Sequence, residues 1–569
     1  MKIDRRELLV RTASSVAAVA GAAWGLPATA RSAGPAIEPD VHIELHAEPG
    51  HVTIRRGVPT RVWRYRGRLL RGDASVLETM PGSYLGPLIR VRRGQRVRIE
   101  LLNGLPEPTI IHWHGLHVPD DMDGHPRFAI APGARYVYEF TVRNRAGSYW
   151  FHPHPHGRTG AQVAAGLAGL FIVGDDEEAA LGLPAGVQDI PLVIQDRQFD
   201  SDNQFVYPGR DSAGPGMPGG EMMGGGMMGG GMMGGGMMGG GMMGGGMMGR
   251  GSGRGMMGRG GMGSMMAAMM GVLGDHILVN GGAQVVREVA RRPHRLRLLN
   301  GANTRTLKLA WSDGSPLTVI GSDGGLLARP VQRDYVMLAP AERVDLWADF
   351  GRRQAGSEVA LRSLAFEGGM DMSGMMGGGM MGGQVGLADG AAFEVQRFRM
   401  DSGSARPGEL PAALAQIAPA DSGAAINAAR PKVFEPTMGM MVWGINGQSF
   451  DMLGASEQET VKLGTQEVWE FRNEGRGSMM GMLMPHAMHV HGLQFRVLSR
   501  AVSRRFADVY RTVGAGFVDE GWKDTVLVMP GERVRVLLRF EDYPGLFLYH
   551  CHMLEHEDSG LMRNYLVKA

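Results

Sequence analysis

The sequence predicts an all-β protein made of three consecutive β-sandwich domains, and three observations lead to this prediction. A chain of 569 residues is long enough for several domains. A strand-like run recurs three times along it, and a second such run follows each copy after a turn. Within these runs apolar residues alternate with charged ones, which is the period of half-buried strands. Repetition of this kind is typical of similar β-sandwiches placed one after another.

The positions of the two repeated elements locate the domains. The first element occupies residues 91–103, 291–300 and 461–473, and the second occupies 132–140, 340–346 and 530–537. From their spacing we predict a first domain at 34–180, a second at 181–365, a linker at 366–430 and a third domain at 431–569.

Residues 1–33 are expected to be a targeting segment rather than part of the fold. Arg5 and Arg6, followed by apolar residues, resemble a twin-arginine signal. An apolar run at 16–26 and small residues at 28–30 complete the pattern of a cleaved signal peptide. That run is too short to span a bilayer, and no later stretch reaches about 18 consecutive apolar residues. We therefore expect a periplasmic protein without a stable membrane span; the alternative is a plain basic tail.

Two segments made of methionine and glycine interrupt the strand pattern. The longer one, 211–271, lies inside the second domain, and the shorter one, 368–383, lies in the linker. Glycine at this density makes any single conformation entropically costly, so both segments are expected to be flexible. Thioethers are soft ligands that select Cu(I), so the segments could gather Cu(I) ions. The alternative is a passive insertion.

The overall charge argues against one class of partner. Lysine and arginine nearly balance aspartate and glutamate, which leaves a formal net charge of +2. No basic patch with interleaved aromatic residues is present. We therefore expect no nucleic-acid partner, and we take a monomer as the expected state.

The histidines are distributed around a single cysteine in a way that predicts metal chemistry. Eighteen histidines in this length should give fewer than one His-x-His pair by chance, yet five occur. Residues i and i+2 of a strand share a face, so each pair can direct two imidazoles at one centre. One cysteine with two histidines is the ligand set of a blue-copper site, and the sequence therefore predicts a copper enzyme. The pairs are His112/His114, His152/His154, His154/His156, His489/His491 and His550/His552, and the cysteine is Cys551.

Four motifs carry a resemblance to a known family. They are His112-Trp113-His114-Gly115, Trp150-Phe151-His152-Pro153-His154, His486-Ala487-Met488-His489-Val490-His491-Gly492, and His550-Cys551-His552 running on to His556. They resemble, in the same order, the motifs of multicopper oxidases, in particular the bacterial three-domain laccase and copper-efflux (cuprous) oxidase branch. The resemblance implies three cupredoxin-like Greek-key sandwiches and four copper ions, of which one is type 1, one type 2 and two type 3.

The resemblance also implies which residues hold each copper. The assignments are His486, Cys551 and His556 for type 1, His112 and His489 for type 2, His114, His152 and His552 for one type 3 ion, and His154, His491 and His550 for the other. His156 falls outside this ligand set. Because the paired motifs come from the first and third blocks only, we expect the trinuclear cluster between those domains. The second domain is then expected to be a spacer.

One position departs from the family pattern. Ten residues after the cysteine, where the family often carries an axial methionine, this chain has Leu561, and Met562 follows it. On a strand these two side chains point to opposite faces, so Met562 is not a free substitute. A leucine that does not bind the metal should leave the type 1 site three-coordinate and raise its reduction potential.

Several further residues match family positions near the coppers. Asp123 and Glu557 match carboxylates that supply protons to the cluster, with a purely structural role as the alternative; Glu555 and Asp558 are weaker candidates. Asp524 is expected to orient a ligand histidine, with capping or surface pairing as the alternative. Met482, Met484 and Asp371 are candidates for a Cu(I) substrate site, together with Met370 or Met372. Met482 stands where the cuprous branch has aspartate, so the set is incomplete.

The resemblance implies an exported multicopper oxidase with a role in copper tolerance. It would take electrons one at a time from Cu(I) and/or from phenolic and aromatic amine substrates, and reduce O2 to water. Two alternatives stay open: a broad-specificity laccase whose methionine-rich segments are incidental, and a copper-sequestering protein without enzyme activity. A copper-free relative is disfavoured because every ligand position is filled.

Overall fold

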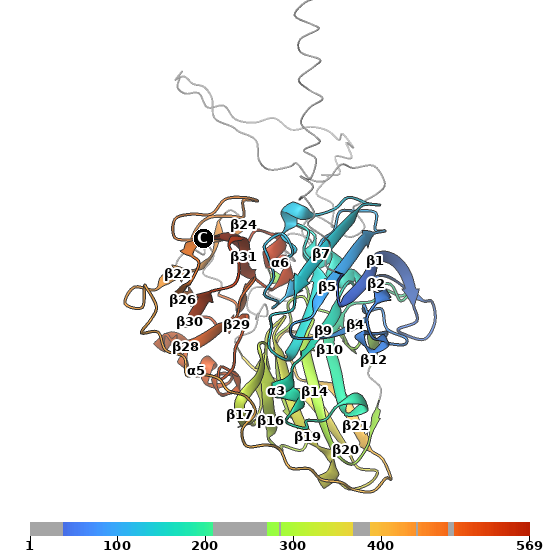
Figure 1. The fold of residues 1–569 in the computed structure, drawn as a ribbon. Coiled ribbons are helices and arrows are strands. Elements are labelled where there is room, and N and C mark those ends of the chain that lie inside the picture. Colours follow the sequence, from blue (N-terminus) through green and yellow to red (C-terminus); the bar gives the residue numbers. More distant parts are fainter. Residues whose placement is uncertain (1–37, 209–269, 284–285, 368–386, 440–441, 476–482) are drawn as a thin grey trace, which may run out of the picture. The chain divides into compact units, whose positions relative to one another are not determined.

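The computed structural model describes residues 38–208, 270–283, 286–367, 387–439, 442–475 and 483–569 (Figure 1). The unit that carries the fold runs from Asp40 to Ala569. The predicted signal peptide, residues 211–269 of the longer methionine-rich segment and the whole of the shorter one lie outside the described residues. None of the helices in the described ranges is long and apolar enough to cross a membrane.

The first sandwich is built from the strands that precede residue 175. They are β1 (Val41–Val52), β2 (Thr60–Arg71), β3 (Leu77–Glu78), β4 (Leu88–Arg92), β5 (Arg96–Asn103), β6 (Ile111–His114), β7 (Arg135–Thr141), β8 (Gly147–Pro153) and β9 (Gly169–Gly174). One sheet has the order β2-β1-β5-β7 and the other β3-β4-β9-β8-β6. In β1 every second residue from Val41 to Ala47 is fully buried, as the alternating pattern requires.

The second sandwich follows the same plan. Its strands are β10 (Asp189–Arg197), β11 (His276–Val279), β12 (Gly282–Ala283), β13 (Arg287–Val289), β14 (Pro293–Asn300), β15 (Leu307–Trp311), β16 (Leu317–Ser322), β17 (Gly325–Arg333), β18 (Val336–Leu338), β19 (Arg343–Asp349), β20 (Glu358–Ser363) and β21 (Phe393–Met400). The sheets have the orders β12-β11-β10-β14-β19-β16-β17 and β13-β21-β20-β15-β18. Strand β21 corrects the interpretation of 366–430 as linker throughout, because it pairs with β20 and β13. The domain boundaries themselves stay predictions.

The third sandwich occupies the C-terminal part. Its strands are β22 (Lys432–Phe434), β23 (Pro436–Gly439), β24 (Val442–Ile445), β25 (Thr460–Lys462), β26 (Thr465–Arg472), β27 (His486–Val490), β28 (Phe495–Val502), β29 (Thr525–Val528), β30 (Glu532–Phe540), β31 (Gly545–Cys551) and β32 (Met562–Lys568). The two main sheets have the orders β22-β26-β30-β28 and β25-β32-β31-β27-β29, and β23 pairs with β24.

The repeat found in the sequence corresponds to one structural element in each sandwich. The two repeated runs form the antiparallel pairs β5/β7, β14/β19 and β26/β30. In each case the first strand of the pair also runs parallel to an earlier strand, which is β1, β10 or β22. The predicted all-β fold of three sandwiches is therefore confirmed.

The short helices lie in the connections between strands. They are α2 (Thr159–Ala165), α3 (Asp176–Ala179), α5 (Ala507–Arg511) and α6 (Leu554–Asp558), with 3₁₀ turns η1 (Ala74–Val76), η2 (Pro126–Phe128), η3 (Gly186–Gln188), η4 (Phe350–Arg352), η5 (Arg504–Phe506) and η6 (Gly514–Gly516). Helices α2 and α6 join the first and third sandwiches, because the carboxylate of Asp558 accepts hydrogen bonds from the backbone N–H groups of Thr159 and Gly160, both at 2.8 Å.

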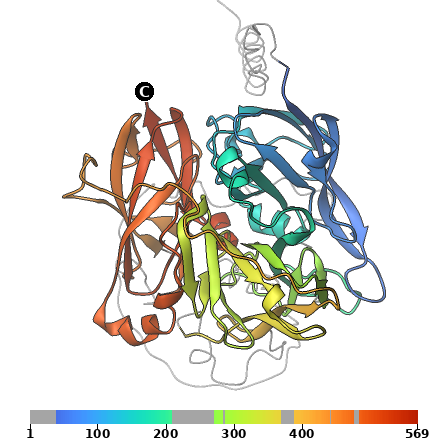
Figure 2. The ribbon, with the colours of Figure 1, turned by 60° about the horizontal axis from the view of Figure 1, so that its bottom comes forward.

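The three sandwiches can be followed by their colours in Figure 2. Each has its own apolar core, and smaller clusters connect the sandwiches. One cluster packs Tyr84 and Trp150 of the first sandwich against Leu299 of the second. Another packs Met337 of the second sandwich against Leu527 of the third. Burial of large apolar side chains stabilises each such contact by about 1.5–3 kcal/mol per residue. Packing between the sandwiches therefore holds together residues that come from different sandwiches.

Candidate metal centre

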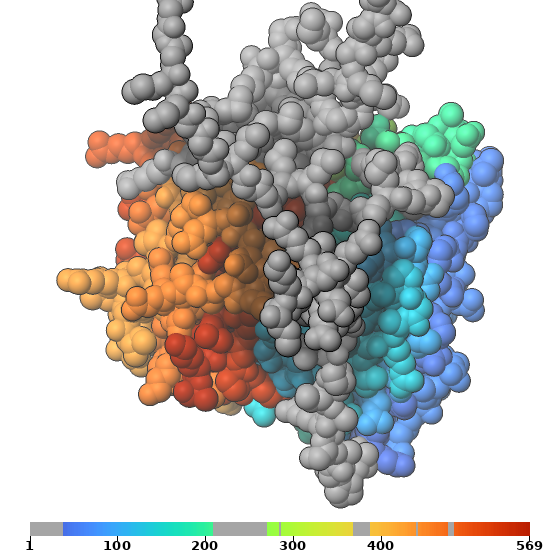
Figure 3. Space-filling model, turned by 90° about the horizontal axis from the view of Figure 1, so that it is seen from above, coloured from blue at the N-terminus to red at the C-terminus, as the bar shows by residue number. Residues whose placement is uncertain are grey.

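Two pairs of antiparallel strands place the histidines. In the first sandwich β6 pairs with β8, so that His112 lies opposite His152. In the third sandwich β27 pairs with β31, so that His489 lies opposite His550. The first and third sandwiches lie beside each other, as the space-filling view shows in blue to cyan and orange to red (Figure 3), and the two histidine sets meet between them. This confirms that the paired motifs of the first and third blocks converge.

Eight buried histidines form one group in which ring nitrogens face each other. His112 Nε2 lies 3.4 Å from His489 Nε2, and His152 Nε2 lies 3.3 Å from His552 Nε2. His550 Nε2 lies 3.4 Å from His154 Nε2 and 3.0 Å from His491 Nε2. The full set is His112, His114, His152, His154, His489, His491, His550 and His552, each with no exposed surface. Sets of three within this group have ligand atoms within 4.8 Å of one another, close enough to share a metal ion.

In three of these histidines the Nδ1 atom, on the side away from the group, donates a hydrogen bond to a backbone oxygen, and this leaves Nε2 facing inward. His112 Nδ1 donates to the backbone oxygen of Asp123 at 2.7 Å, and His489 Nδ1 donates to the backbone oxygen of Asp524 at 2.8 Å. His152 Nδ1 donates to a backbone oxygen in the same way, at 2.9 Å. With the proton on Nδ1, the lone pair of Nε2 faces the centre of the group, as a metal ligand requires.

His114 is oriented the other way round. Its Nε2 lies 3.0 Å from Asp524 Oδ1 and 3.2 Å from Thr525 Oγ1. Its buried Nδ1 has no hydrogen-bond partner among the described residues. A buried polar atom without a partner is costly unless it has a ligand, so this nitrogen fits a bound metal ion. Asp524 therefore lies where the sequence predicted an orienting carboxylate.

The group is held in the neutral state that metal ligands need. Burial lowers the pKa of His114, His152, His154, His489, His491 and His552 well below the ordinary value, and the neighbouring imidazoles lower it further. Burial lowers the pKa of His550 to about 3. A neutral imidazole has a nitrogen lone pair, and neighbouring neutral imidazoles in a closed space have few protons to donate to it. A bound metal ion would accept these lone pairs.

A second group contains the cysteine. Cys551 Sγ, at the end of β31, lies 3.6 Å from His486 Nδ1 in β27 and 3.8 Å from His556 Nδ1 in α6. All three residues are buried, and the Trp443 ring lies against both imidazoles. Burial raises the pKa of the Cys551 thiol to about 12. A thiol in such surroundings is inert unless a cation replaces its proton, so this group also fits a metal.

Leu561 and Met562 occupy different environments, although only Met562 belongs to a strand, since β32 begins at Met562. Leu561 belongs to the same buried apolar cluster as Cys551, and its backbone oxygen accepts the N–H of Cys551 at 3.0 Å. Met562 lies opposite His550 in the pairing of β31 and β32 and is outside that cluster.

Asp123 and Glu557 lie directly against the eight histidines. Asp123 Oδ2 accepts from His491 Nδ1 at 2.7 Å, and its Oδ1 has no hydrogen-bond partner in the described part of the chain. Glu557 has one carboxylate oxygen 3.2 Å from His550 Nδ1 and the other 3.5 Å from His154 Nε2. Burial raises the pKa of both carboxyl groups, that of Glu557 strongly.

The other acidic candidates have structural partners. Glu555 accepts hydrogen bonds from Tyr207, Asn303 and Thr304. Asp558 caps the start of α2, and burial raises its pKa to about 7. Both lie in or beside α6 on the side of the first two sandwiches.

The Cu(I) candidates are only partly described. Met484 is buried in the core of the third sandwich, and its backbone oxygen accepts from Asn473. Met482, Asp371, Met370 and Met372 lie outside the described residues. His156 packs on Phe450, with ring centroids 4.9 Å apart, and does not belong to any of the metal-binding groups found in the described chain.

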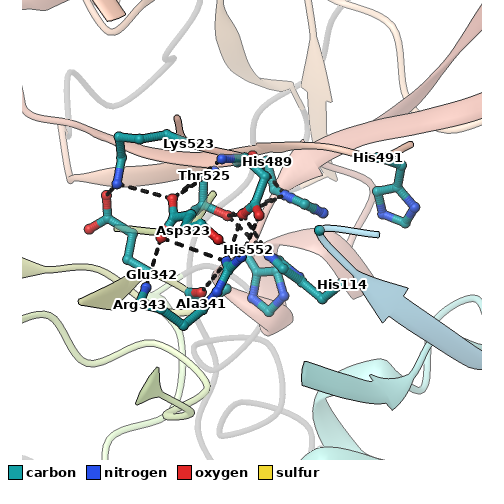
Figure 4. A network of polar contacts seen from close by, with 12 residues as sticks. His114, Asp323, Ala341, Glu342, Arg343, His489, His491, Lys523, Thr525 and His552 are labelled. Carbon is teal, nitrogen blue, oxygen red and sulfur yellow. Dashed lines mark hydrogen bonds and ion pairs between the residues drawn. The ribbon is translucent and has the colours of Figure 1, made fainter. Parts of the chain in front are cut away.

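Sequence reasoning missed a buried ionic network that the second sandwich contributes (Figure 4). Arg343 donates to both carboxylate oxygens of Asp524, at 2.7 and 2.5 Å. Lys523 Nζ lies 3.0 Å from Asp323 Oδ2 and 2.9 Å from Glu342 Oε1. Because Asp524 bonds to His114, the second domain contacts the ligand shell and is more than a spacer.

One signal in the sequence could have revealed this site. Ala341 stands in the repeated turn where the other two copies have Gly133 and Gly531. All three have positive φ, and at Ala341 φ is +72°. A non-glycine residue in the left-handed region often marks a functional site. The backbone oxygen of Ala341 accepts from Arg343 Nη1 at 3.0 Å.

Comparisons with known proteins agree with this geometry. Family models described as multicopper oxidase match residues 65–178 and 425–569. Laccase of Bacillus subtilis (strain 168) is 28% identical over 552 residues, which cover 89% of this chain and 90% of that protein. The crystal structure of the McoA multicopper oxidase 2F4 variant from Aquifex aeolicus is 31% identical, covers 93% of this chain and 96% of that one, and has a TM-score of 0.69.

The chain is also similar to a protein whose name refers to cell division and not to oxidation. Cell division protein FtsP of Shigella dysenteriae is 28% identical over 592 residues and matches essentially the full length of both chains. A similar overall sequence therefore does not by itself fix the role of a chain, which is argued from its site. Here that site is formed by the buried histidine and cysteine groups. This chain belongs to the multicopper oxidase family, whose members bind copper and oxidise their substrates with dioxygen.

Proposed function

We propose that the chain holds four copper ions and couples oxidation of a reductant to reduction of O2 to water. The type 1 ion would be bound by His486, Cys551 and His556. The other three would be bound by the eight histidines in the assignment given above. The observation that carries this proposal is the set of buried Nε2 atoms within 3.0–3.4 Å of one another, where His112, His152 and His489 hold their Nδ1 protons on backbone oxygens and so turn Nε2 lone pairs inward.

When bound, copper would supply the one-electron transfers that connect oxidation of the substrate to the four-electron reduction of O2. The chain provides the connection between the two sites. Cys551 is covalently continuous with His550 and His552, and the N–H of His552 donates to the backbone oxygen of Ala487 at 2.6 Å. The residues that hold the two sites are therefore neighbours on one rigid segment.

Two buried carboxyl groups are placed to hold protons for this reaction. Burial raises the pKa of the Glu557 carboxyl well above its ordinary value, which favours its protonated form. Burial also raises the pKa of the Asp123 carboxyl, which accepts a hydrogen bond from His491. A carboxyl group that is protonated near the working pH is an effective general acid. We assign proton delivery at the cluster to these two residues.

For the reductant we propose Cu(I), with phenols and aromatic amines as further substrates. The thioethers of segments 211–271 and 368–383, with Met482, Met484 and Asp371, supply soft ligands for Cu(I). This assigns the enzyme to copper tolerance in the periplasm, reached through the twin-arginine signal. The alternative is a broad-specificity laccase. It is favoured by the missing aspartate at position 482 and by the similarity to a laccase-like CueO of Ochrobactrum sp. with activity towards lignin model compounds, which is 26% identical.

The test is oxygen uptake with Cu(I) and, separately, with a diphenol. It compares the intact copper-loaded protein with a variant lacking residues 215–270, and with a variant of full length in which the methionines of 215–270 are replaced by serine. If both variants lose Cu(I) oxidation selectively, thioether capture of Cu(I) is supported. If neither variant changes either activity, the laccase alternative is correct.

Two further outcomes concern the alternatives. A protein that binds many Cu(I) ions per chain but takes up no oxygen with either substrate is a copper-sequestering protein, and the enzyme proposal is then wrong. Export is tested separately by fusing residues 1–33 to a reporter protein. Replacing Arg5 and Arg6 by lysine should abolish periplasmic delivery if the signal is of the twin-arginine type.

A further inference from the structure

A cavity of about 520 Å³ opens at the boundary between the first and third sandwiches. His117 and Gln494, which lie three residues beyond His114 and His491, line it from the two sides. The remaining wall comes from Arg93 and Gly94, from residues 141–145, from Trp522, and from Arg539, Glu541 and Asp542 at the end of β30 and just beyond it. None of the histidine or cysteine ligands assigned above lines this cavity, so it is distinct from the metal centre.

Arg145 and Arg539 line this cavity, and Arg496 lies against the ring of its wall residue Trp522. Arg145 comes from the first sandwich, and Arg496 and Arg539 come from the third. None of these three arginines forms an ion pair among the described residues. Other arginines of the same sandwiches do form such pairs. Arg496 donates only to the backbone oxygens of Ala418 and Glu520, at 3.0 and 3.1 Å. Three positive charges therefore lie near one another without an ion-pair partner in the described chain.

Trp522 holds two of these groups in position. The guanidinium carbon of Arg496 lies 5.4 Å from the indole centroid, and that of Arg539 lies 5.8 Å from it. Contacts of this type are favourable and restrict the orientation of the guanidinium plane. The charges are near enough to affect each other, because burial and the charges of Arg145 and Arg539 lower the pKa of Arg496. The group is thus preorganised and electrostatically strained.

The cavity also contains polar donors without partners. Gln494 is 7% exposed, and its Nε2 has no hydrogen-bond partner in the described chain. The same holds for Arg145 Nη1 and for the Nε atoms of Arg496 and Arg539. Two acids line the cavity: Asp542 is paired with His117 at 2.6 Å and with Arg143 at 3.1 Å, and Glu541 has an exposed side chain that forms no ion pair with these arginines in the described chain. A buried donor without a partner is destabilising, and an anion would satisfy it.

We infer that this cavity binds a tetrahedral oxyanion, phosphate or sulfate, which ties the first sandwich to the third. A carboxylate presents two oxygens in one plane, which one arginine can satisfy. Here Arg145, Arg539 and the amide of Gln494 line the cavity from separate elements, with Arg496 beside Trp522, and a tetrahedral anion has oxygens in enough directions to meet them. Because Arg145 and the other two arginines belong to different sandwiches, a bound anion bridges the boundary on which the eight-histidine group is built.

The test is titration calorimetry on the copper-loaded protein with phosphate, sulfate, acetate and chloride at constant ionic strength. Phosphate and sulfate should bind once per chain and raise the midpoint of denaturant unfolding, whereas acetate and chloride should not. Arg145→Gln and Arg539→Gln should each weaken phosphate binding about tenfold or more, because each removes a charge-assisted hydrogen bond. Both side chains are half-exposed, so neither change should prevent folding.

Arg505→Gln is the matched control. Arg505 also stacks on an aromatic ring, that of Phe506 at 5.2 Å, but it is exposed and lies outside the cavity. It should leave phosphate binding unchanged. Equal binding of acetate or chloride, equal weakening by Arg505→Gln, unchanged binding in Arg145→Gln and Arg539→Gln, or no binding of phosphate and sulfate at millimolar concentration would each overturn the inference.

Discussion

Arg343, in the second sandwich, holds both carboxylate oxygens of Asp524, in the third, at 2.7 and 2.5 Å, and neither side chain is exposed. The same guanidinium donates through Nε to the backbone oxygen of Ser148 in the first sandwich, at 2.9 Å. Asp524 in turn bonds to His114. One side chain thus connects all three sandwiches to a histidine of the proposed cluster, and a bidentate pair of this kind fixes orientation as well as distance.

Replacing Arg343 by methionine should lower the free energy of unfolding by about 3–5 kcal/mol, because it leaves the charge of Asp524 buried and uncompensated. It should also release His114, so that copper is lost from the three-copper cluster before it is lost from the type 1 site. Denaturant unfolding measures the first effect. Copper content together with the electron paramagnetic resonance signals of the sites measures the second.

Arg533→Met provides the control for this change. Arg533 occupies the same position in the third copy of the repeat, but its side chain is 42% exposed and pairs with Glu474 near the surface. An exposed pair contributes about 0–1 kcal/mol, so stability and copper content should hardly change. If Arg343→Met and Arg533→Met behave alike, Arg343 does not position His114.

The eight-histidine group could be predicted from sequence because it depends on local geometry. A strand directs residues i and i+2 to one face, so His112 and His114 had to point the same way. The three sandwiches were predictable for the same reason, since their repeated strands alternate in polarity. The prediction that the second sandwich is only a spacer was wrong. Arg343 resembles Arg135 and Arg533 in its local sequence, yet of these three only Arg343 is fully buried. Its partner is 181 residues away, and no local pattern encodes such a contact.

The metal-free protein should lose stability as the pH falls below about 6.5. Burial lowers the pKa of the buried histidines in the folded state, so the unfolded chain binds more protons between that lowered pKa and the ordinary value. Stability is then fully present above pH 6.5 and falls by up to about 1.4 kcal/mol per pH unit for each such histidine. Denaturant unfolding of the metal-free protein at several pH values between 7.5 and 5.5 measures this slope.

Copper loading should flatten that dependence, because bound copper must be displaced before the imidazoles can take up protons. The raised pKa values of Asp123 and Glu557 act in the opposite sense, since stability from a protonated carboxyl is lost as the pH rises above the ordinary carboxyl value. The histidines outnumber these carboxyls. A metal-free protein whose stability is unchanged from pH 7.5 to 5.5 would show that the imidazoles are not buried in the neutral form.

Glu557→Gln should slow O2 reduction by about 10²-fold or more, because it removes a positioned general acid. Oxidation of the substrate at the type 1 site under anaerobic conditions should be unaffected. The loss should change with pH across the titration of the Glu557 carboxyl, whose pKa burial raises in the wild-type protein. The measurement is the pH profile of oxygen uptake, with single-turnover reduction of the type 1 site measured separately.

Glu555→Gln controls for the introduction of an amide into α6. Glu555 is also buried, but it is bonded to Tyr207, Asn303 and Thr304 rather than to the histidines. We expect this variant to lose stability without a change in the pH profile. A Glu557→Gln enzyme that keeps the wild-type profile would remove Glu557 from the proton pathway and leave Asp123 as the candidate.

Leu561→Met should lower the reduction potential of the type 1 site. Leu561 packs in the same cluster as Cys551, so a methionine there can bring a thioether to the axial position, and the axial ligand tunes the potential. The two side chains are close in volume, so the change should cost less than about 1.5 kcal/mol of stability. Met562→Leu is the control, because Met562 is paired opposite His550 and is absent from that cluster. Redox titration of the blue absorption band measures the reduction potential of each variant. A lower potential in Leu561→Met alone supports Leu561 as the axial residue. A changed potential in Met562→Leu alone would assign that role to Met562.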